Sequence, residues 1–335
     1  MSVDKNQKLF APLKEGQNSV LPLVSISMPA FNAENYIAEA IESILAQSYQ
    51  NFELIICDDG STDRTSEIIN RYNDPRIVKI FSQKNRGLIA TRNEIAQLAR
   101  GKYLALLDAD DLAFPDRLAL QVKFLEDGNA DLCGADHWTL NQGTGAIKPS
   151  RQRHSNADIQ ALLSVCSPLC NPAVMGRIEI FRRHPYLTSY IHAEDYCLWT
   201  EIALAGYKFS NIPQKLIIYR LHPTQTSVNH MSSARNVFRS YQSRYLEGLG
   251  ISPAYLPRTL AFRERLVFGV HFMRLINKKI ANISFAANCE LYARFQFRGN
   301  GLWTLLTRLE RVIIAACASW QGRRSSLDGE SRLLT

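Results

Sequence analysis

The chain has 335 residues, of which 46% are hydrophobic and 21% charged, a composition that excludes intrinsically disordered, collagen-like and other fibrous proteins. No apolar run reaches the roughly 18 to 20 residues of a membrane-spanning helix, and the polar N-terminus lacks the form of a secretory signal, so we expect a cytoplasmic protein. The net charge of +8 is unevenly placed, because residues 231–335 hold 16 Lys and Arg against 6 Asp and Glu.

Apolar strands alternate with amphipathic helices along the first part of the chain. Strands are predicted at 23–28, from 52, at 77–81 and at 103–107, and helices around 37–45 and at 65–71, 88–100 and 115–126. This alternation predicts an α/β domain with a mostly parallel sheet and helices on both faces.

The pattern changes towards both ends of the chain. Residues 1–20 are polar and aperiodic, which predicts a flexible leader. A further strand at 131–140 and a helix at 157–165 continue the α/β part, and from Ser232 the pattern is helical. We therefore expect three parts: the leader 1–20, an α/β domain over 21–230, and a basic, mainly helical region over 231–335.

Three polar motifs directly follow predicted strands: PAFN at 29–32, DDGSTD at 58–63 and DADD at 108–111. In open parallel sheets ligands bind at the carboxyl ends of the strands, so we expect these loops on one rim. The crowded carboxylates of DADD repel one another unless a cation or hydrogen-bond donors compensate them. A metal ion is the obvious candidate.

The motifs VSISMPAFN, CDDGSTD, KNRGLIATRNEIA, ALLDADD, HAEDYCLW and YRLH occur in an order that resembles the family 2 glycosyltransferases. These are inverting enzymes of GT-A fold that transfer a sugar from a nucleotide donor. The resemblance covers roughly residues 23–227 and implies a Rossmann-like GT-A domain with a C-terminal helical extension. It also implies transfer from a nucleotide sugar, with UDP-sugars favoured, to a glycan or lipid-linked acceptor in bacterial surface-polysaccharide synthesis.

In this family the acids of the DADD motif bind the metal and the donor. Carried over by position, Asp110 and Asp111 are expected to bind Mn²⁺ or Mg²⁺, which prefer oxygen ligands, and Asp108 to lie nearer the ribose or sugar. The alternative for such an acid cluster is a solvated loop in which Asp111 caps a helix.

The resemblance also assigns a nucleotide pocket. Asp59 matches the position that hydrogen-bonds the base, commonly uracil, and Pro29, Phe31 and Asn32 should frame the same pocket. The DDGSTD stretch is equally typical of a turn followed by a helix N-cap, so Asp58 is left as structural.

Three basic side chains are expected close to the donor. Arg92 matches a position where a guanidinium clamps a phosphate or holds the aspartates in register, with an exposed helix arginine as the alternative. Arg220 is expected to pair with phosphate. His222 is expected to bind phosphate or the metal, although a single loop histidine more often does neither.

The acceptor hydroxyl must lose a proton as it attacks the sugar, and a carboxylate is the simplest base. Asp195 in HAEDYCLW matches the family position assigned as this base, and Glu194 is its paired acid. Tyr196 and Trp199 indicate partial burial, which raises a carboxyl pKa.

Two other functions compete with this interpretation. Phosphatases of the haloacid dehalogenase type also place Asp-x-Asp after a strand, but after their first strand, whereas here it follows the fourth. A non-catalytic sugar-nucleotide-binding protein is the other alternative.

The basic C-terminal segments allow two interpretations. In the first, they are interfacial helices that bind the inner face of the cytoplasmic membrane. In the second, they pack onto the α/β domain or onto another subunit. No nucleic-acid recognition module is apparent, so a nucleic-acid partner is not expected.

Overall fold

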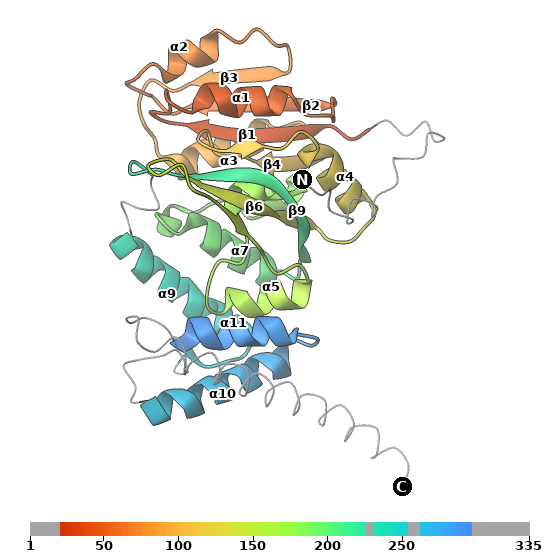
Figure 1. Cartoon of the computed structure of the whole chain (residues 1–335), viewed down its shortest axis with the longest axis vertical. Helices are drawn as coiled ribbons and strands as arrows, with labels where there is room; N and C mark the ends of the chain where they lie inside the picture. The colour runs from red at the N-terminus through yellow and green to blue at the C-terminus, as the bar shows by residue number, and fades with distance from the viewer. Residues whose placement is uncertain (1–20, 226–230, 254–261, 297–335) are drawn as a thin grey trace.

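The structure is a computed structural model, which describes residues 21–225, 231–253 and 262–296 (Figure 1). The expected flexible leader, 1–20, and the final basic stretch from residue 297 lie outside the described residues. The strands are β1 Val24–Ala30, β2 Phe52–Asp58, β3 Ile77–Phe81, β4 Tyr103–Leu106, β5 Leu112–Ala113, β6 Leu132–Asn141, β7 Ile147–Ser150, β8 Met175–Arg177 and β9 Phe209–Leu221.

Helices alternate with these strands and then form the C-terminal end of the described chain. They are α1 Ile37–Leu45, α2 Thr65–Asn70, α3 Leu88–Leu98, α4 Arg117–Glu126, α5 Asn156–Leu163, α6 Ile178–Arg183, α7 Glu194–Leu204, α9 Met231–Gly248, α10 Phe262–Lys279 and α11 Phe285–Gln296, with 3₁₀ turns η1 Asn171–Ala173 and η2 Thr188–Tyr190. The N-cap position of α1 is Tyr36, and no side-chain hydrogen bond caps this helix.

All the described strands belong to one sheet of order β3-β2-β1-β4-β8-β6-β9-β5, with β7 paired to the outer part of β6. The first four strands in sequence, β1 to β4, are parallel, while β8, β7 and β5 add antiparallel pairings. β1 continues through Pro29 to Ala30, beyond the predicted end at residue 28. The ladder with β4 ends at Ser27, so the missing N–H of Pro29 removes no hydrogen bond to β4.

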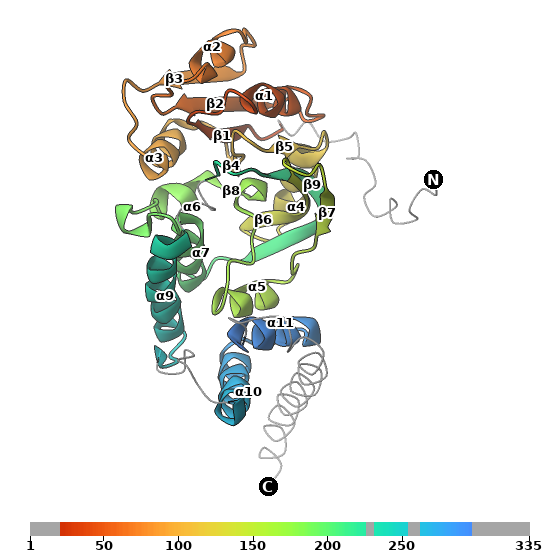
Figure 2. The same ribbon diagram turned by 60° about the vertical axis from the view of Figure 1, so that its left-hand side comes forward.

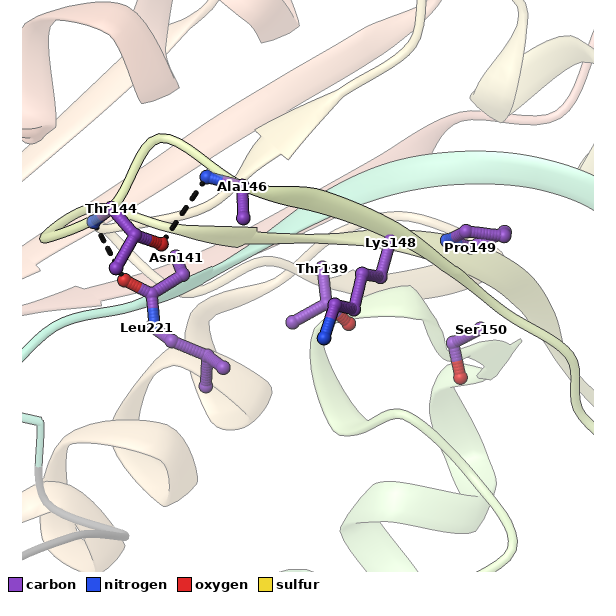
Figure 3. Close-up of a pocket in the computed structure, with 8 residues that line it drawn as sticks. All are labelled: Thr139, Asn141, Thr144, Ala146, Lys148, Pro149, Ser150 and Leu221. Carbon is purple, nitrogen blue, oxygen red and sulfur yellow. Dashed lines mark hydrogen bonds between the residues drawn. The ribbon is translucent and has the colours of Figure 1, made fainter.

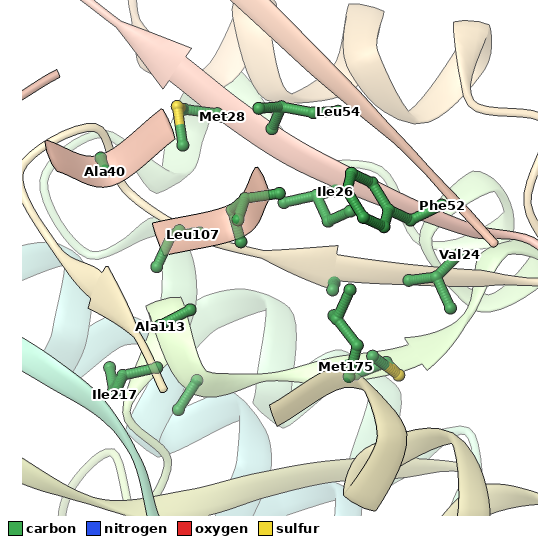
Figure 4. Packing of buried hydrophobic residues seen from close by; sticks show 14 of the residues in the cluster. Val24, Ile26, Met28, Ala40, Phe52, Leu54, Leu107, Ala113, Met175 and Ile217 are labelled. Atoms are coloured by element: carbon green, nitrogen blue, oxygen red, sulfur yellow. The ribbon is translucent and has the colours of Figure 1, made fainter. Parts of the chain in front are cut away.

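Two hydrophobic clusters cover the two faces of the sheet, as the sequence predicted. One joins β1 to α1 and α4 through residues such as Ile26, Ile41 and Leu118, all fully buried. Figure 4 shows part of this cluster, with Ile26 of β1 and Ala40 of α1. The other joins β2 and β4 to α3, α6 and α7, with Trp199 fully buried in it. Each face of the sheet therefore has its own apolar cover.

The described C-terminal helices turn apolar residues towards the protein. α9 lies along α7, and α10 and α11 lie beyond α5 (Figures 1 and 2). A third cluster includes Leu162 of α5, Ile276 of α10 and Leu291 of α11, and Asp158 accepts hydrogen bonds from the backbone N–H and hydroxyl of Ser284, each at 2.7 Å. Among the described helices none is long and apolar enough to cross a bilayer.

Candidate active site

A cleft of about 1400 Å³ opens where the carboxyl ends of β1, β2 and β4 meet the first turns of α3 and α7 and the end of β9. Most of the residues predicted for the site line it: Pro29, Phe31, Asn32, Asp59, Arg92, Asp108, Asp110, Glu194, Asp195 and His222. Asp111 and Arg220 do not.

Arg92 joins two carboxylates that are far apart in the sequence. Its Nη2 donates to Asp108 Oδ1 at 2.8 Å and its Nη1 to Glu194 Oε1 at 3.3 Å, while the guanidinium lies 5.5 Å from the centre of the Tyr186 ring. Only 5% of the side chain is exposed. Burial by itself lowers the pKa of Arg92, but the charge of Asp108 raises it overall, so the guanidinium stays protonated. The arginine therefore holds the acids in register.

Asp110 and His222 contact each other in the cleft. Its Oδ2 lies 2.8 Å from His222 Nε2, and the other ring nitrogen, Nδ1, lies 2.9 Å from Thr224 Oγ1. The His222 ring rests against Tyr36, with ring centroids 4.7 Å apart. Burial and then the nearby charge of Asp108 raise the pKa of Asp110. The pair offers one oxygen and one nitrogen to a cation, and no set of three potential ligands occurs among the described residues.

Asp111 is placed differently from the prediction. It is fully buried, and its Oδ1 accepts a 2.8 Å hydrogen bond from the backbone N–H of Arg220, while its Oδ2 has no hydrogen-bond partner. A tight turn, with the Asp111 N–H donating to the Asp108 carbonyl at 3.1 Å, sends Asp111 under the rim. Burial, followed by the charge of Asp110, raises its pKa well above the usual range. Asp111 joins the acid turn to β9 and is not a cleft carboxylate.

Arg220 also turns away from the cleft, against the expected phosphate contact. The guanidinium pairs with Glu39 of α1 and lies 5.4 Å from the centre of the Tyr36 ring. Side chains alternate along a strand, so with Tyr219 lining the cleft Arg220 points to the opposite side of β9. Its place is structural, beneath Tyr36 and His222.

The expected nucleotide end of the cleft is built from the turn after β2 and the loop before α3. Both oxygens of Asp59 accept from the backbone N–H of Arg86, at 3.0 and 3.1 Å, and Oδ2 also accepts from Gly87 at 2.7 Å. Asn32 has φ 49° and accepts from the Thr62 N–H at 2.9 Å. Asp59 thus connects β2 to the loop before α3, while Phe31, 47% exposed, remains uncovered.

Asp58 has the structural environment that the turn motif indicated. It accepts hydrogen bonds from the Ser61 N–H and hydroxyl and from the Ser66 hydroxyl. These bonds close the turn that follows β2.

Asp195 occupies the first turn of α7, beside Glu194. Burial first, and then the charge of Glu194, raise its pKa to about 6. One oxygen accepts from the Tyr196 N–H at 2.7 Å. Such a carboxylate is ionised at neutral pH and still basic enough to take a proton.

Several cleft residues were not found from the sequence. His137, Asn171 and Gln225 line the cleft, each at least nine-tenths buried, and carry atoms without a hydrogen-bond partner: Nδ1, Oδ1 and Oε1 respectively. They come from β6, η1 and the segment after β9, so no local motif links them. Only the folded sheet brings them together.

The family model described as glycosyl transferase family 2 matches residues 25–186. A glucosyltransferase of Escherichia coli named UDP-Glc:alpha-D-GlcNAc-diphosphoundecaprenol beta-1,3-glucosyltransferase WfaP is 31% identical over 69% of this chain and 88% of its own length. The chain belongs to glycosyl transferase family 2.

The family assignment confirms the resemblance drawn from the motifs, but some relatives in the family are much longer than this chain. An uncharacterized glycosyltransferase of Rickettsia felis is 34% identical over 54% of this chain, and the match spans only 30% of that relative.

Solved structures agree with the predicted GT-A fold. Staphylococcus aureus TarS 1–349 in complex with UDP-GlcNAc has a TM-score of 0.54 at 16% identity, covering 90% of this chain and 92% of TarS 1–349. The Pyrobaculum calidifontis mannosyltransferase PcManGT, in complex with GDP-Man and Mn²⁺, has a TM-score of 0.51 at 17% identity, covering 89% and 87%. At this identity the likeness shows the α/β fold.

The Asp-x-Asp follows β4, the fourth strand, which removes the dehalogenase-type alternative.

Proposed function

We propose that the chain is a glycosyltransferase that moves a sugar from a nucleotide-sugar donor to a hydroxyl of a glycan or lipid-linked acceptor. The observation that carries this proposal is a single cleft in which Arg92 holds Asp108, from the end of β4, close to Glu194, which is next to Asp195 on α7. Acids for donor binding and an acid for proton transfer thus share one space.

The donor is proposed to be a UDP-sugar. The name of WfaP contains UDP-Glc, and TarS binds UDP-GlcNAc. Asp59 fits the role of base acceptor through Oδ1, which accepts one hydrogen bond from the backbone N–H of Arg86 and keeps a lone pair, whereas Oδ2 already accepts from both Arg86 and Gly87. Uracil presents a ring N–H to such an acceptor, whereas adenine has none at the equivalent ring position. Pro29, Phe31 and Asn32 would enclose the same end of the cleft.

A divalent cation fits the acid turn. Asp110 has a raised pKa because it is buried next to another carboxylate, which is the environment that a cation would relieve. Asp110 and His222 would hold Mn²⁺ or Mg²⁺, with phosphate oxygens and water completing the shell, as is common for such ions. When bound, the ion would act as a Lewis acid for the leaving diphosphate. Asp111 is left out of this set because of its burial.

Asp195 is proposed as the general base. The acceptor oxygen forms a bond to the anomeric carbon as the bond from that carbon to the phosphate oxygen breaks, and the electron pair leaves with the diphosphate. The acceptor proton passes to Asp195, whose pKa of about 6 leaves it ionised at neutral pH. Attack opposite the leaving group inverts the configuration. Arg92 keeps Glu194 and Asp108 in place around this path.

The acceptor is proposed to be lipid-linked, as in assembly of a bacterial surface polysaccharide. The name of WfaP contains a GlcNAc unit on diphosphoundecaprenol, an acceptor anchored in a membrane. An enzyme using such an acceptor would work at the inner face of the cytoplasmic membrane, with its basic C-terminal region near the lipid.

A donor screen tests the proposal. The purified chain is incubated with UDP-Glc, UDP-Gal, UDP-GlcNAc or GDP-Man and Mn²⁺, and nucleotide release is measured with and without EDTA. We expect release with a UDP-sugar that stops with EDTA and returns on adding Mn²⁺. Binding of a nucleotide sugar without release from any donor would instead make the chain a non-catalytic binding protein.

A further inference from the structure

A second, open pocket of about 530 Å³ adjoins the cleft at the β6–β7 hairpin (Figure 3). It is lined by Thr139, Asn141, Thr144, Ala146, Lys148, Pro149, Ser150 and Leu221. Ser150 lines both this pocket and the cleft, so the two spaces share a wall. None of these residues was assigned a role by the motifs.

The strand register makes the cleft and the outer pocket one continuous surface. Across β6 and β7, His137 pairs with Ser150 and Thr139 with Lys148. Side chains two residues apart share a face, so His137 in the cleft and Thr139 in the pocket point the same way. Figure 3 shows Thr139, Lys148 and Ser150 on the same side of the hairpin.

The inner end of this surface needs hydrogen-bonding partners. His137 Nδ1, Asn171 Oδ1 and Gln225 Oε1 are buried without one, and a buried polar atom left unpaired costs about 1–3 kcal/mol. Burial lowers the pKa of His137, so its ring is neutral and one nitrogen accepts. Hydroxyl groups, which both donate and accept, suit all three atoms. A sugar ring carries several.

The outer end suits a second sugar. Thr139, Asn141 and Ser150 provide hydroxyl and amide groups, and the aliphatic parts of Ala146 and Leu221 provide apolar contact. Lys148 is the single cation among the lining residues, which fits a neutral glycan better than a diphosphate. The residues proposed for the nucleotide lie on or directly after β1 and β2 and on α3, whereas this surface is built from β6, β7, η1, the end of β9 and the segment after it.

We propose that the outer pocket is a second acceptor subsite, which holds the penultimate sugar of an oligosaccharide whose terminal sugar lies against His137, Asn171 and Gln225. The inference rests on the proposed function. The enzyme would then extend chains of two or more sugars and would recognise the penultimate sugar of the acceptor as well as the terminal one.

Two tryptophan variants of the full chain test the subsite. Ala146 is exposed and lines the pocket, so Ala146→Trp fills it without entering the core. Ile147 is the next residue, 56% exposed, and its side chain points to the other face of β7, so Ile147→Trp is the matched control. The dissociation constants of glucose, cellotriose, N-acetylglucosamine and chitotriose are measured by saturation-transfer NMR with UDP and Mn²⁺ present.

We expect the unaltered chain to bind one trisaccharide about tenfold more tightly than its monosaccharide, the effect of roughly 1.4 kcal/mol. Ala146→Trp should reduce this ratio to about one, and Ile147→Trp should leave it unchanged. The subsite is refuted if the unaltered chain shows no preference for length, or if both variants behave alike. If Lys148→Gln alone weakened trisaccharide binding, and the effect depended on salt, the outer pocket would bind an anion. That result would also refute the glycan subsite.

The same samples separate this inference from the proposed function. Because the ratio is a binding measurement, it does not depend on turnover. Absence of nucleotide release with every donor, while the length preference and its loss in Ala146→Trp persist, would refute transfer and leave the glycan subsite standing. Nucleotide release without a preference for trisaccharides over monosaccharides would support transfer and refute the glycan subsite.

Discussion

Neighbouring aspartates of the DADD motif have unlike environments, although the sequence presents them as equivalent. Asp110 lies in the cleft beside His222, and Asp111 is enclosed beneath it and bonded to the backbone of Arg220. Burial raises the pKa of Asp111, and its position beneath the rim keeps its carboxyl out of the cleft where a metal would bind.

Substituting the two aspartates separately tests this difference. We expect Asp110→Asn to weaken Mn²⁺ binding at least about tenfold, because it removes a charged ligand worth more than 1.4 kcal/mol. Asp111→Asn keeps the shape of a side chain that does not line the cleft, so it should change Mn²⁺ binding less than about threefold. Calorimetric titration of each variant measures both. Equal losses would return Asp111 to the metal site.

The assignment of Asp195 as base is tested by rate and by pH. Asp195→Asn should reduce transfer by about 10²–10⁴-fold, the usual contribution of a general base, with nucleotide affinity unchanged. In the unaltered chain the base form exists above the pKa of about 6, so the rate should fall as pH decreases through 6. Initial rates between pH 4.5 and 8 measure this. A rate independent of pH over that range would contradict the assignment.

At the scale of elements, a close approach of two loops shapes the nucleotide end of the cleft. Gly60 in the turn after β2 has φ +74°, and a Cβ at this position would lie 2.7 Å from the backbone carbon of Lys84. The turn after β2 and the loop before α3 can approach this closely only because residue 60 has no side chain. Asp59, next to it, bonds the same loop.

A pair of glycine substitutions isolates this contact. Gly128 also has φ +74° but has no atom within 4 Å of an added Cβ. Gly128→Ala should therefore cost about 1 kcal/mol for the backbone conformation alone. Gly60→Ala should cost about 1–3 kcal/mol more, because the added methyl group overlaps backbone atoms. Urea denaturation measures both values. Equal costs would show that the loops move apart freely.

The sequence predicted most elements up to residue 165, including the short helix α2, but it missed the helix α7, the longest strand β9 and the shortest strands. Helices α1 and α3 and strands β2 and β3 occur where the apolar pattern placed them: the helices bury apolar side chains on one side, β2 is buried throughout and β3 is partly buried. Strands of two to four residues, such as β5, β7 and β8, are too short to show a period. Their pairing depends on distant partners, and β7 is the strand on which the outer pocket depends.

At the scale of the whole molecule, the C-terminal helices extend the α/β domain. Their buried apolar residues, including Phe272 and Ile276, pack against α5 and α9. This packing favours the interpretation that the apolar faces of these helices cover the α/β domain. The division of the chain at residue 230 stays a prediction. The exposed arginines of α9, like Arg274, Lys278 and Lys279 of α10, remain available to an anionic surface.

Membrane contact is tested with those arginines. Arg235 and Arg239 are exposed on α9, and each basic residue near an anionic bilayer contributes about 1 kcal/mol. Arg235→Gln with Arg239→Gln should reduce sedimentation with phosphatidylglycerol vesicles about 30-fold. Arg64→Gln with Arg71→Gln, exposed around α2 at the other end of the molecule, is the control (Figure 1). No sedimentation of the unaltered chain would contradict membrane contact.

The sequence by itself determined the fold class and the family, and it placed most of the residues predicted for the site at the cleft. Strand ends in a parallel sheet meet at one rim, so motifs that follow strands must lie together, and hydrophobic periodicity shows which segments are strands. Only the tertiary structure decided where side chains point. Asp111 and Arg220 turn beneath the rim because of a tight turn and strand alternation, and His137, Asn171 and Gln225 join the cleft through contacts between distant segments.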